Sequence, residues 1–381
     1  MQENQHATRL SPPAKSDISA DVDTSTFTLK PAPWSVHCQS WWLILSILGS
    51  TRKLLDRAKF QPQSRKRSTR SGSGANSDSL GLLSTEESDP AQGFRGGIGF
   101  VQIVRYPLSP VGAYDELLLV PGSFKPPEEC LDGSPKFRIT QIYVSSLESV
   151  LNGKSSRHIG GRCVEECHRI LMKESKSSLT GRRNWNIPKK LARFEFIQME
   201  GSANKTNVKI YGLKSFSFTP SNSSTGWFFE PVFHPTPFFD VIIHRHLPRL
   251  NIPVNVGQLP MLDLTILQPP LPVNEPLDPD ILGIDSGTAG TSDWKQTELG
   301  IKGPCGVCTF KGNLAGRNGQ IADGELFPDF KPYRLGIHFP RMYLEIQAST
   351  SMTVDPIRSR KNSKNHYEKK MIYSQHNHLL H

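Results

Sequence analysis

The sequence GFVQIVRYPLSPVGAYDELLLVPGSF, residues 99–124, contains the pattern that decides the fold. Two apolar runs, 99–106 and 114–124, are separated by a segment with two prolines and a glycine, and a Pro-Gly pair interrupts the end of the second run. Short runs rich in Val, Ile, Phe and Tyr and bounded by such turn residues are typical of β-strands. This stretch therefore predicts two consecutive strands joined by a turn.

The same pattern recurs along the rest of the chain. Apolar and polar residues alternate with a period of two, as in 341–347, where Met342, Leu344 and Ile346 share one side. Thirty prolines and thirty glycines argue against long helices. The sequence therefore predicts a mostly β protein with few helices, and so many strands favour a closed or wrapped sheet. Further strand-like runs lie at 137–146, 191–199, 208–212, 215–218, 226–233 and 261–268.

The chain of 381 residues divides into one ordered domain and flanking segments. Residues 1–30 are polar and lack periodicity, so we expect a disordered N-terminus. The ordered domain is expected to span 31–347, with a low-complexity loop at 51–93, and a basic tail at 348–381 is expected to be disordered. The apolar run WWLILSILGS, residues 41–50, is too short for a membrane span and is interpreted as a short buried helix.

Residues 154–180, KSSRHIGGRCVEECHRILMKESKSSLT, differ from their surroundings. They are polar, poor in strand-forming residues, and contain two of the six cysteines. Two interpretations stay open: a surface insertion loop, or a retained intron, because the codons of Gly153-Lys154 and Thr180-Gly181 can carry donor-like and acceptor-like splice sites. Sequencing the cDNA across this region distinguishes the two interpretations.

The formal net charge of +10 is concentrated in the segments 52–70 and 358–370. Such patches can bind nucleic acid or a membrane surface, but the first cluster contains a single aromatic residue, Phe60, whereas single-strand binding would require several to stack successive bases. We interpret both segments as solvated flanks and expect neither nucleic acid nor a membrane as a partner. The first thirty residues show no signal peptide, so a cytoplasmic protein is expected.

Six cysteines in a chain of this length do not indicate a disulfide framework. Only Cys305-Gly-Val-Cys308 resembles a zinc-knuckle spacing, and the spacing of Cys163, Cys167 and His168 does not. We therefore expect no metal and no cofactor.

Two segments resemble the acetoacetate decarboxylase-like superfamily. GRRNWNIPKKLARF, residues 181–194, is similar to the lysine motif of acetoacetate decarboxylases, a Gly-Arg segment followed by aromatic-Pro-Lys-Lys-Leu. GAYDELLLVPGSF, residues 112–124, resembles the upstream Tyr-x-Glu segment of that family. The likeness is to a eukaryotic branch of the superfamily; it runs from about Pro31 to about Gln347 and is firmest over 95–200. It implies a β-cone, a closed antiparallel sheet with outer strands and few helices.

The resemblance also implies site residues. Lys189 takes the position of the Schiff-base lysine, Lys190 that of its neighbouring lysine, and Glu116 that of the motif's glutamate. The family's second acidic residue falls near Val101 or Gln102, where this chain has no carboxylate. A small keto acid or carbonyl compound is implied as the ligand, and a homo-oligomer as the assembly. The candidates for substrate contacts are Tyr114, Trp185, Ile187 and Phe194.

A lysine acts as a nucleophile only when its amine is uncharged. An ordinary lysine has a pKa of ~10.4, so about one amine in a few thousand is neutral at pH 7. Burial lowers this pKa, and we expect burial to act on Lys189 more than repulsion, because adjacent side chains on a strand point to opposite faces. The sequence thus predicts a Schiff-base-forming, decarboxylase-like protein acting on a small β-keto acid, with Glu116 orienting the substrate or relaying a proton.

Two alternatives stay open from the sequence. A non-catalytic β-cone that binds a small or lipid-like carbonyl compound would carry the same motifs. A gene product whose pocket is spoiled by the segment 154–180 would also carry them.

Overall fold

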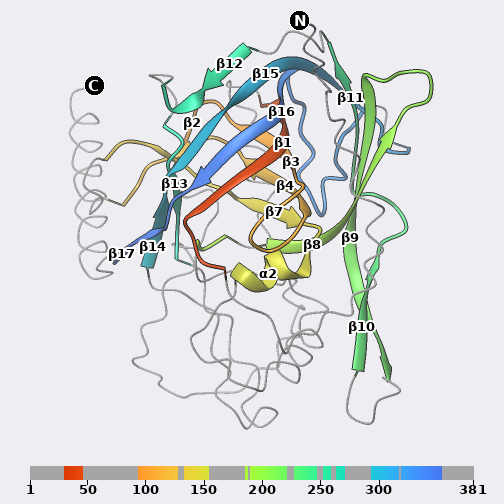
Figure 1. Ribbon diagram of the computed structural model, residues 1–381, viewed down its shortest axis with the longest axis horizontal. Helices are drawn as coiled ribbons and strands as arrows, with labels where there is room; N and C mark the ends of the chain where they lie inside the picture. The colour runs from red at the N-terminus through yellow and green to blue at the C-terminus, as the bar shows by residue number, and fades with distance from the viewer. Residues whose placement is uncertain are drawn as a thin grey trace, which may run out of the picture.

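The computed structural model describes ten stretches of the chain, most of them strands. Within them lie two β-sheets and a single α-helix, α2 (Leu147–Gly153) (Figure 1). The mostly β fold expected from the alternation is confirmed. No helix in these ten stretches is both long enough and apolar enough to cross a membrane. The described residues are 30–45, 93–127, 133–153, 185–187, 189–220, 227–246, 252–258, 263–270, 293–316 and 319–353.

Nine strands form a closed ring, as expected for a closed sheet. Their order is β9, β11, β15, β16, β1, β3, β4, β7 and β8, and β8 pairs with β9 to close the ring. Neighbours run antiparallel except β7 and β8, which are parallel. The strands are β1 (Trp34–Ile44), β3 (Phe100–Tyr106), β4 (Tyr114–Val120), β7 (Gln141–Val144), β8 (Lys189–Gln198), β9 (Lys205–Pro220), β11 (Phe239–Arg245), β15 (Leu299–Gly312) and β16 (Leu335–Ile346).

Two further strands and a second sheet are added outside this ring. β10 (Trp227–Phe233) extends β9 into a two-stranded ribbon that projects from the rest of the protein, and β12 (Ile252–Asn255), followed by the 3-10 turn η3 (Val256–Gln258), pairs with β15 (Figure 1). The second sheet has six strands, with one parallel pairing between β6 and β13. In order they are β17 (Thr350–Thr353), β14 (Asp293–Thr297), β13 (Ile266–Gln268), β6 (Lys136–Phe137), β5 (Ser123–Phe124) and β2 (Phe94–Gly96).

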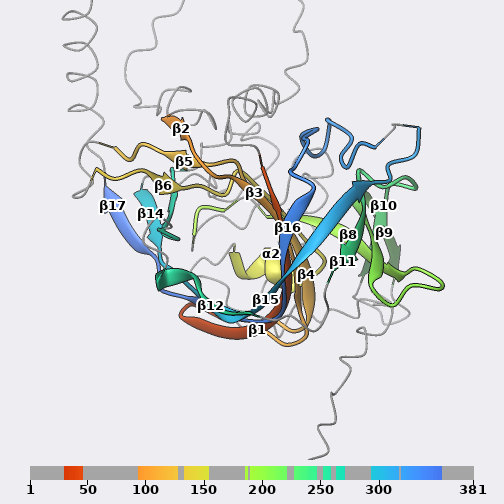
Figure 2. The ribbon, with the colours of Figure 1, turned by 90° about the horizontal axis from the view of Figure 1, so that it is seen from above.

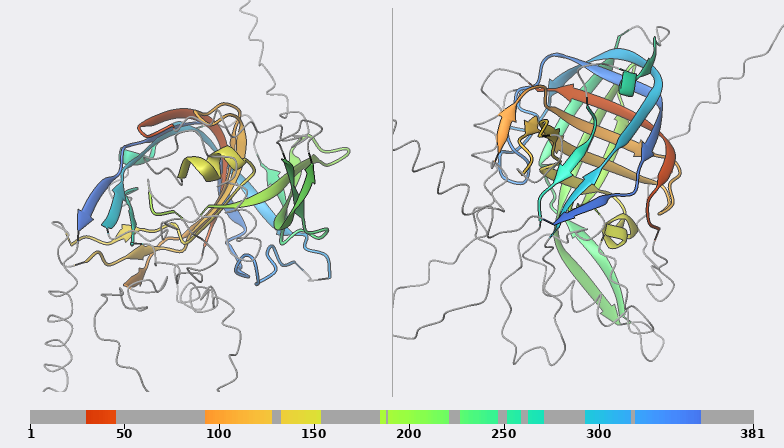
Figure 3. Two further views of the ribbon diagram at one scale, coloured as in Figure 1. Left: turned by 90° about the horizontal axis from the view of Figure 1, so that it is seen from below. Right: turned by 90° about the vertical axis from the view of Figure 1, so that its left-hand side faces the viewer.

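The ring strands that form the wall facing the second sheet are buried on both faces. This burial produces two separate hydrophobic clusters. The ring cluster fills the interior of the ring with side chains such as Leu117, Tyr143 and Phe239. The inter-sheet cluster, which includes Leu118 and Ile266, lies between the ring wall and the second sheet. In Figures 2 and 3, α2 lies under the arch formed by β1, β15 and β16, on the side of the second sheet.

β15 serves both clusters because its backbone is irregular in the middle. Ile301 belongs to the inter-sheet cluster and Cys308 to the ring cluster, and the register with β16 shifts between Lys302 and Gly306. Gly303 has a φ of 152°, and a Cβ there would lie 2.4 Å from the carbonyl oxygen of Arg341. A larger residue at 303 would therefore prevent the switch between the two layers.

The structure corrects two expectations about the ends of the domain. Trp41–Ile44 belong to β1 rather than to a short helix, because this strand has the ring cluster on one face and the inter-sheet cluster on the other. A strand buried on both faces has the same continuous apolar run as a buried helix. The ordered domain also extends past Gln347, because Thr350–Thr353 form β17 and pair with β14.

Several sequence predictions fall mostly or wholly outside the described residues. They concern the disordered N-terminus, the low-complexity loop at 51–93, the segment 154–180 and the basic tail after Thr353.

Candidate functional site

A cavity of about 90 Å³ lies between the ring wall and the second sheet. One water needs roughly 10–15 Å³ on this scale, so the cavity has room for about six to nine waters or a small organic molecule. Most of its lining consists of isoleucine and leucine side chains together with Trp34 and Trp185. Its polar lining residues are Gln102, Tyr106, Tyr114, Glu116, Lys189 and Thr297.

Lys189 is buried at the start of β8, where that strand pairs in parallel with β7. Its Nζ donates a hydrogen bond to Ser149 Oγ at 3.0 Å and lies 5.8 Å from the ring centres of both Tyr114 and Trp185. Burial lowers the pKa of Lys189, and attraction to Glu116 opposes this effect only in part. An ammonium has three N–H donors, and among the described residues Ser149 accepts one of them, so the surroundings suit an uncharged amine.

The segment before β8 is fixed by Asn186, which has a φ of 52°. Its Nδ2 donates to the carbonyl oxygens of Pro269 at 3.1 Å and Asp293 at 2.7 Å, so it ties this segment to the second sheet. The ring of the preceding residue, Trp185, stands edge-on to Trp34 at 5.4 Å. These contacts hold Trp185 and Ile187 against the cavity next to the lysine.

Glu116 and Tyr114 project from β4 into the same cavity. Tyr114 Oη donates to Glu116 Oε2 at 3.3 Å, and the Tyr114 ring stacks on Tyr106 at 4.5 Å. Burial raises the pKa of Glu116, and the attraction of Lys189 and the Tyr114 hydrogen bond lower it by less. Burial also raises the pKa of Tyr114 well above its usual value. Burial therefore shifts both groups toward their uncharged forms.

Ser149 was not among the residues singled out from the sequence. It lies in the first turn of α2, whose start is capped by Ser146: Ser146 Oγ accepts from the backbone N–H of Ser149 at 3.1 Å. The side chain of Asn152 ties the other end of α2 to the backbone of Lys30, with distances of 2.7 and 2.9 Å. The capping serine in SSLESVLNG signals the helix start, but no local signal shows that this helix packs beside β8.

Gln102 lines the cavity near the position where the resemblance implied a second carboxylate. Its Nε2 donates to Ser40 Oγ at 3.0 Å, and Trp42 Nε1 donates to the same oxygen at 3.0 Å. A side-chain amide has two N–H donors, and Ser40 engages one of them. The site thus presents an uncharged polar group where the family presents an acid.

The structure brings together five of the seven predicted site residues. Lys189, Glu116, Tyr114, Trp185 and Ile187 all line the cavity.

Lys190 and Phe194 are placed elsewhere. Lys190 lies over the ring of Tyr143 at 5.2 Å, on the ring-cluster side of β8, and burial lowers its pKa to about 7. Phe194 is a member of the ring cluster and does not line the cavity, which corrects its assignment as a pocket wall. The expected opposite orientation of the two lysines is found.

No group of three or more His, Cys, Asp or Glu side chains able to hold a metal ion occurs among the described residues. Cys308 is buried in the ring cluster and Cys305 packs against the inter-sheet cluster, so the two thiols face different layers.

Fold and site together define a mostly β protein in which a closed sheet and a second sheet enclose a buried lysine and a buried carboxyl group. No protein-family model and no curated protein matches the chain. Among solved structures, the chain is similar to an acetoacetate decarboxylase, with 6% identity, a TM-score of 0.42 and coverage of 85% of this chain and 91% of that one.

Two further structures show the same degree of likeness. One is an acetoacetate decarboxylase-like enzyme from Sphingomonas wittichii RW1, with 11% identity, a TM-score of 0.39 and coverage of 86% of this chain and 95% of that one. The other is the enduracididine biosynthesis enzyme MppR complexed with pyruvate, with 11% identity, a TM-score of 0.38 and coverage of 85% and 91%. At TM-scores below 0.5 the likeness is distant.

Proposed function

We propose that this protein is a Schiff-base lyase that decarboxylates a small β-keto acid, with Lys189 as the nucleophile. The observation that carries the proposal is the burial of the Lys189 amine in a mostly apolar cavity that also contains the Glu116 carboxyl group. A buried lysine with a lowered pKa is the form of this side chain that attacks a carbonyl carbon.

The chemistry requires a place for the electrons of the broken carbon–carbon bond. The Lys189 nitrogen attacks the ketone carbon, water leaves, and a positively charged iminium forms. The bond to the carboxylate then breaks, CO₂ leaves, and the electron pair moves toward the nitrogen to give an enamine. Glu116 takes up a proton from solvent after the iminium has formed and supplies it to the enamine carbon, and water then releases the ketone and the free amine. One proton is consumed overall, and CO₂ and the ketone are the products.

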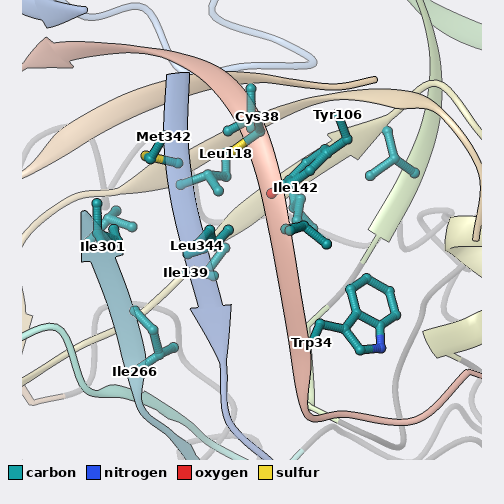
Figure 4. Close-up of a cluster of buried hydrophobic side chains, with 14 of the residues drawn as sticks. Trp34, Cys38, Tyr106, Leu118, Ile139, Ile142, Ile266, Ile301, Met342 and Leu344 are labelled. Carbon is teal, nitrogen blue, oxygen red and sulfur yellow. The ribbon is translucent and has the colours of Figure 1, made fainter. Parts of the chain in front are cut away.

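The lining supports an anionic group at one end of the substrate and an apolar group at the other. The second N–H of the Gln102 amide is suited to bind the substrate carboxylate, which carries less charge as CO₂ forms. Apolar surroundings favour that loss of charge. In Figure 4, Ile266, Ile301 and Leu344 lie on one side of the cluster and Tyr106 and Trp34 on the other, so an aliphatic substituent on the ketone fits the first side.

Borohydride trapping tests this proposal. The protein is incubated with acetoacetate or 3-oxohexanoate, reduced with sodium borohydride, and mapped by mass spectrometry. We expect a covalent adduct on the peptide that contains Lys189, release of CO₂, and no adduct in the variant Lys189→Met. Ligand binding without adduct or CO₂ release would support the alternative, a non-catalytic protein that binds a carbonyl compound.

A further inference from the structure

Four buried polar groups form a chain across the cavity wall. The Lys189 amine donates to Ser149 Oγ at 3.0 Å, and the Tyr114 hydroxyl donates to Glu116 Oε2 at 3.3 Å. Ser149 also acts on the Tyr114 hydroxyl and lowers the Tyr114 pKa, so it lies next to both pairs. Both measured hydrogen bonds point the same way, from the amine toward the carboxyl group.

These groups are almost fully shielded from bulk solvent. The exposed fraction is 0% for Ser149, 4% for Lys189, 5% for Tyr114 and 6% for Glu116. A proton that leaves the Lys189 nitrogen therefore has a nearby acceptor in Ser149, and exchange with bulk solvent at these atoms is restricted.

Schiff-base formation makes a specific demand on this site. Conversion of the carbonyl oxygen to water requires two protons on that oxygen, and Glu116 is the only carboxyl group among the described residues that line the cavity. A single carboxyl group gives up one proton at a time. The attacking nitrogen carries an extra proton after the attack and is therefore a nearby source of the second proton.

We propose that Ser149 and Tyr114 form a proton relay that returns the proton of the attacking Lys189 nitrogen to Glu116 during Schiff-base formation. This inference rests on the proposed function. Ser149 does not touch the reacting carbon; it acts through Lys189 and Tyr114 and is a relay residue.

The steps balance as follows. The nitrogen attacks the carbonyl carbon, and protonated Glu116 transfers its proton to the developing oxyanion, which leaves a carboxylate and a positively charged nitrogen. The extra proton passes from nitrogen to Ser149 as Ser149 passes its own to Tyr114 and Tyr114 passes its own to Glu116. Glu116 then protonates the hydroxyl group, water leaves, and the nitrogen lone pair completes the iminium. The net change is one carbonyl, one amine and one proton converted to one iminium and one water.

Separate rates for two steps test the relay. The first is Schiff-base formation with 2-butanone, measured by borohydride quenching at timed intervals and by the mass added to Lys189. The second is deuterium uptake at the α-carbons of the same ketone in D₂O, divided by the amount of covalent complex. This second rate reports proton transfer at carbon, which uses Glu116 directly.

We expect Ser149→Ala to slow Schiff-base formation by at least about tenfold and to leave deuterium uptake per complex within about twofold of the native rate. We expect Tyr114→Phe to slow Schiff-base formation by a similar factor. Since both break the same relay, the double variant is expected to be no slower than the slower single variant. Glu116→Gln is expected to slow both steps. Val150→Ala, which truncates a buried residue next to Ser149 in α2, controls for disturbance of the helix.

Three results would overturn the relay: a native rate of Schiff-base formation in Ser149→Ala, an equal loss in both steps, or multiplied losses in the double variant. A different result would overturn the proposed function and the relay together, namely a native chain that gains no mass on Lys189 at any pH. Tyr114→Phe keeps the stacked ring, so it decides the question if Ser149→Ala does not fold.

Discussion

Replacement of Lys189 by Met tests whether the amine is held uncharged in the folded protein. Burial lowers the folded-state pKa of Lys189 below its usual value of 10.5. In the unfolded chain the pKa returns to ~10.4, so between the two values the unfolded chain binds one more proton than the folded chain. The free energy of unfolding of the native protein therefore rises with pH by about 1.4 kcal/mol per pH unit in that window.

Methionine has a similar length and no charge, so Lys189→Met lacks this dependence. We expect the variant to be more stable than the native protein at pH 7, and this advantage to shrink by about 1.4 kcal/mol for each pH unit between the folded-state pKa and ~10.4. Urea denaturation at pH 7, 8 and 9, followed by tryptophan fluorescence, measures the difference. Lys190 is present in both proteins, so its titration cancels.

A difference in stability that stays the same from pH 7 to pH 9 would refute this reasoning. It would mean that Lys189 is charged and paired with Glu116. In that case Lys189→Met would also be less stable than the native protein, because it would leave a buried carboxylate without its partner. Lys311→Met, at an exposed position of β15, controls for the loss of a lysine at the surface.

Three further predictions concern residues around the lysine. Burial raises the folded-state pKa of Glu116. As the pH rises from ~4.3 to that pKa, the free energy of unfolding of the native protein should therefore fall by about 1.4 kcal/mol per pH unit. Urea denaturation across pH 4–8 should show this fall for the native protein and not for Glu116→Gln. Asn186→Ala removes two hydrogen bonds to the second sheet and should lower the free energy of unfolding by about 2–4 kcal/mol; Asn186→Gly, which tolerates the positive φ, should lose about 1 kcal/mol less. Lys190→Met should leave the rate of trapping on Lys189 within about twofold, and a tenfold loss would contradict the separation of the two lysines.

The strands could be predicted from the sequence because their signals are local. Residues 100–106 and 114–120 alternate or are bounded by Pro and Gly, and both segments form strands at those positions. The same local signal failed at Trp41–Ile44, because a strand with buried neighbours on both faces has no alternation to show. A strand buried on both faces can still be recognised where turn residues bound it, as Pro and Gly do at 100–106 and 114–120.

The site was predicted in part, and the errors have simple causes. Phe194 lies five positions after Lys189, and an odd separation on a regular strand puts two side chains on opposite faces. Its place in the ring cluster therefore follows from the period of the strand. Ser149 could not be found in this way, because its role depends on where α2 packs against β7 and β8, which is a tertiary contact.

Burial lowers the pKa of both adjacent lysines, although their side chains lie on opposite faces of the sheet. Burial is the largest cause of the lowered pKa of each, and attraction to Glu116 opposes it for Lys189. Because β8 alternates, Lys189 enters the cavity between the sheets while Lys190 lies over Tyr143 on the ring side. The sheet separates the two side chains, and repulsion between the two lysines is not needed to lower the pKa of either one. Side chains of the ring cluster pack on the side of Lys190, and the cavity lies on the side of Lys189. The pair in the sequence therefore corresponds to one lysine in the cavity, which is the proposed nucleophile, and one buried neighbour that faces the other layer.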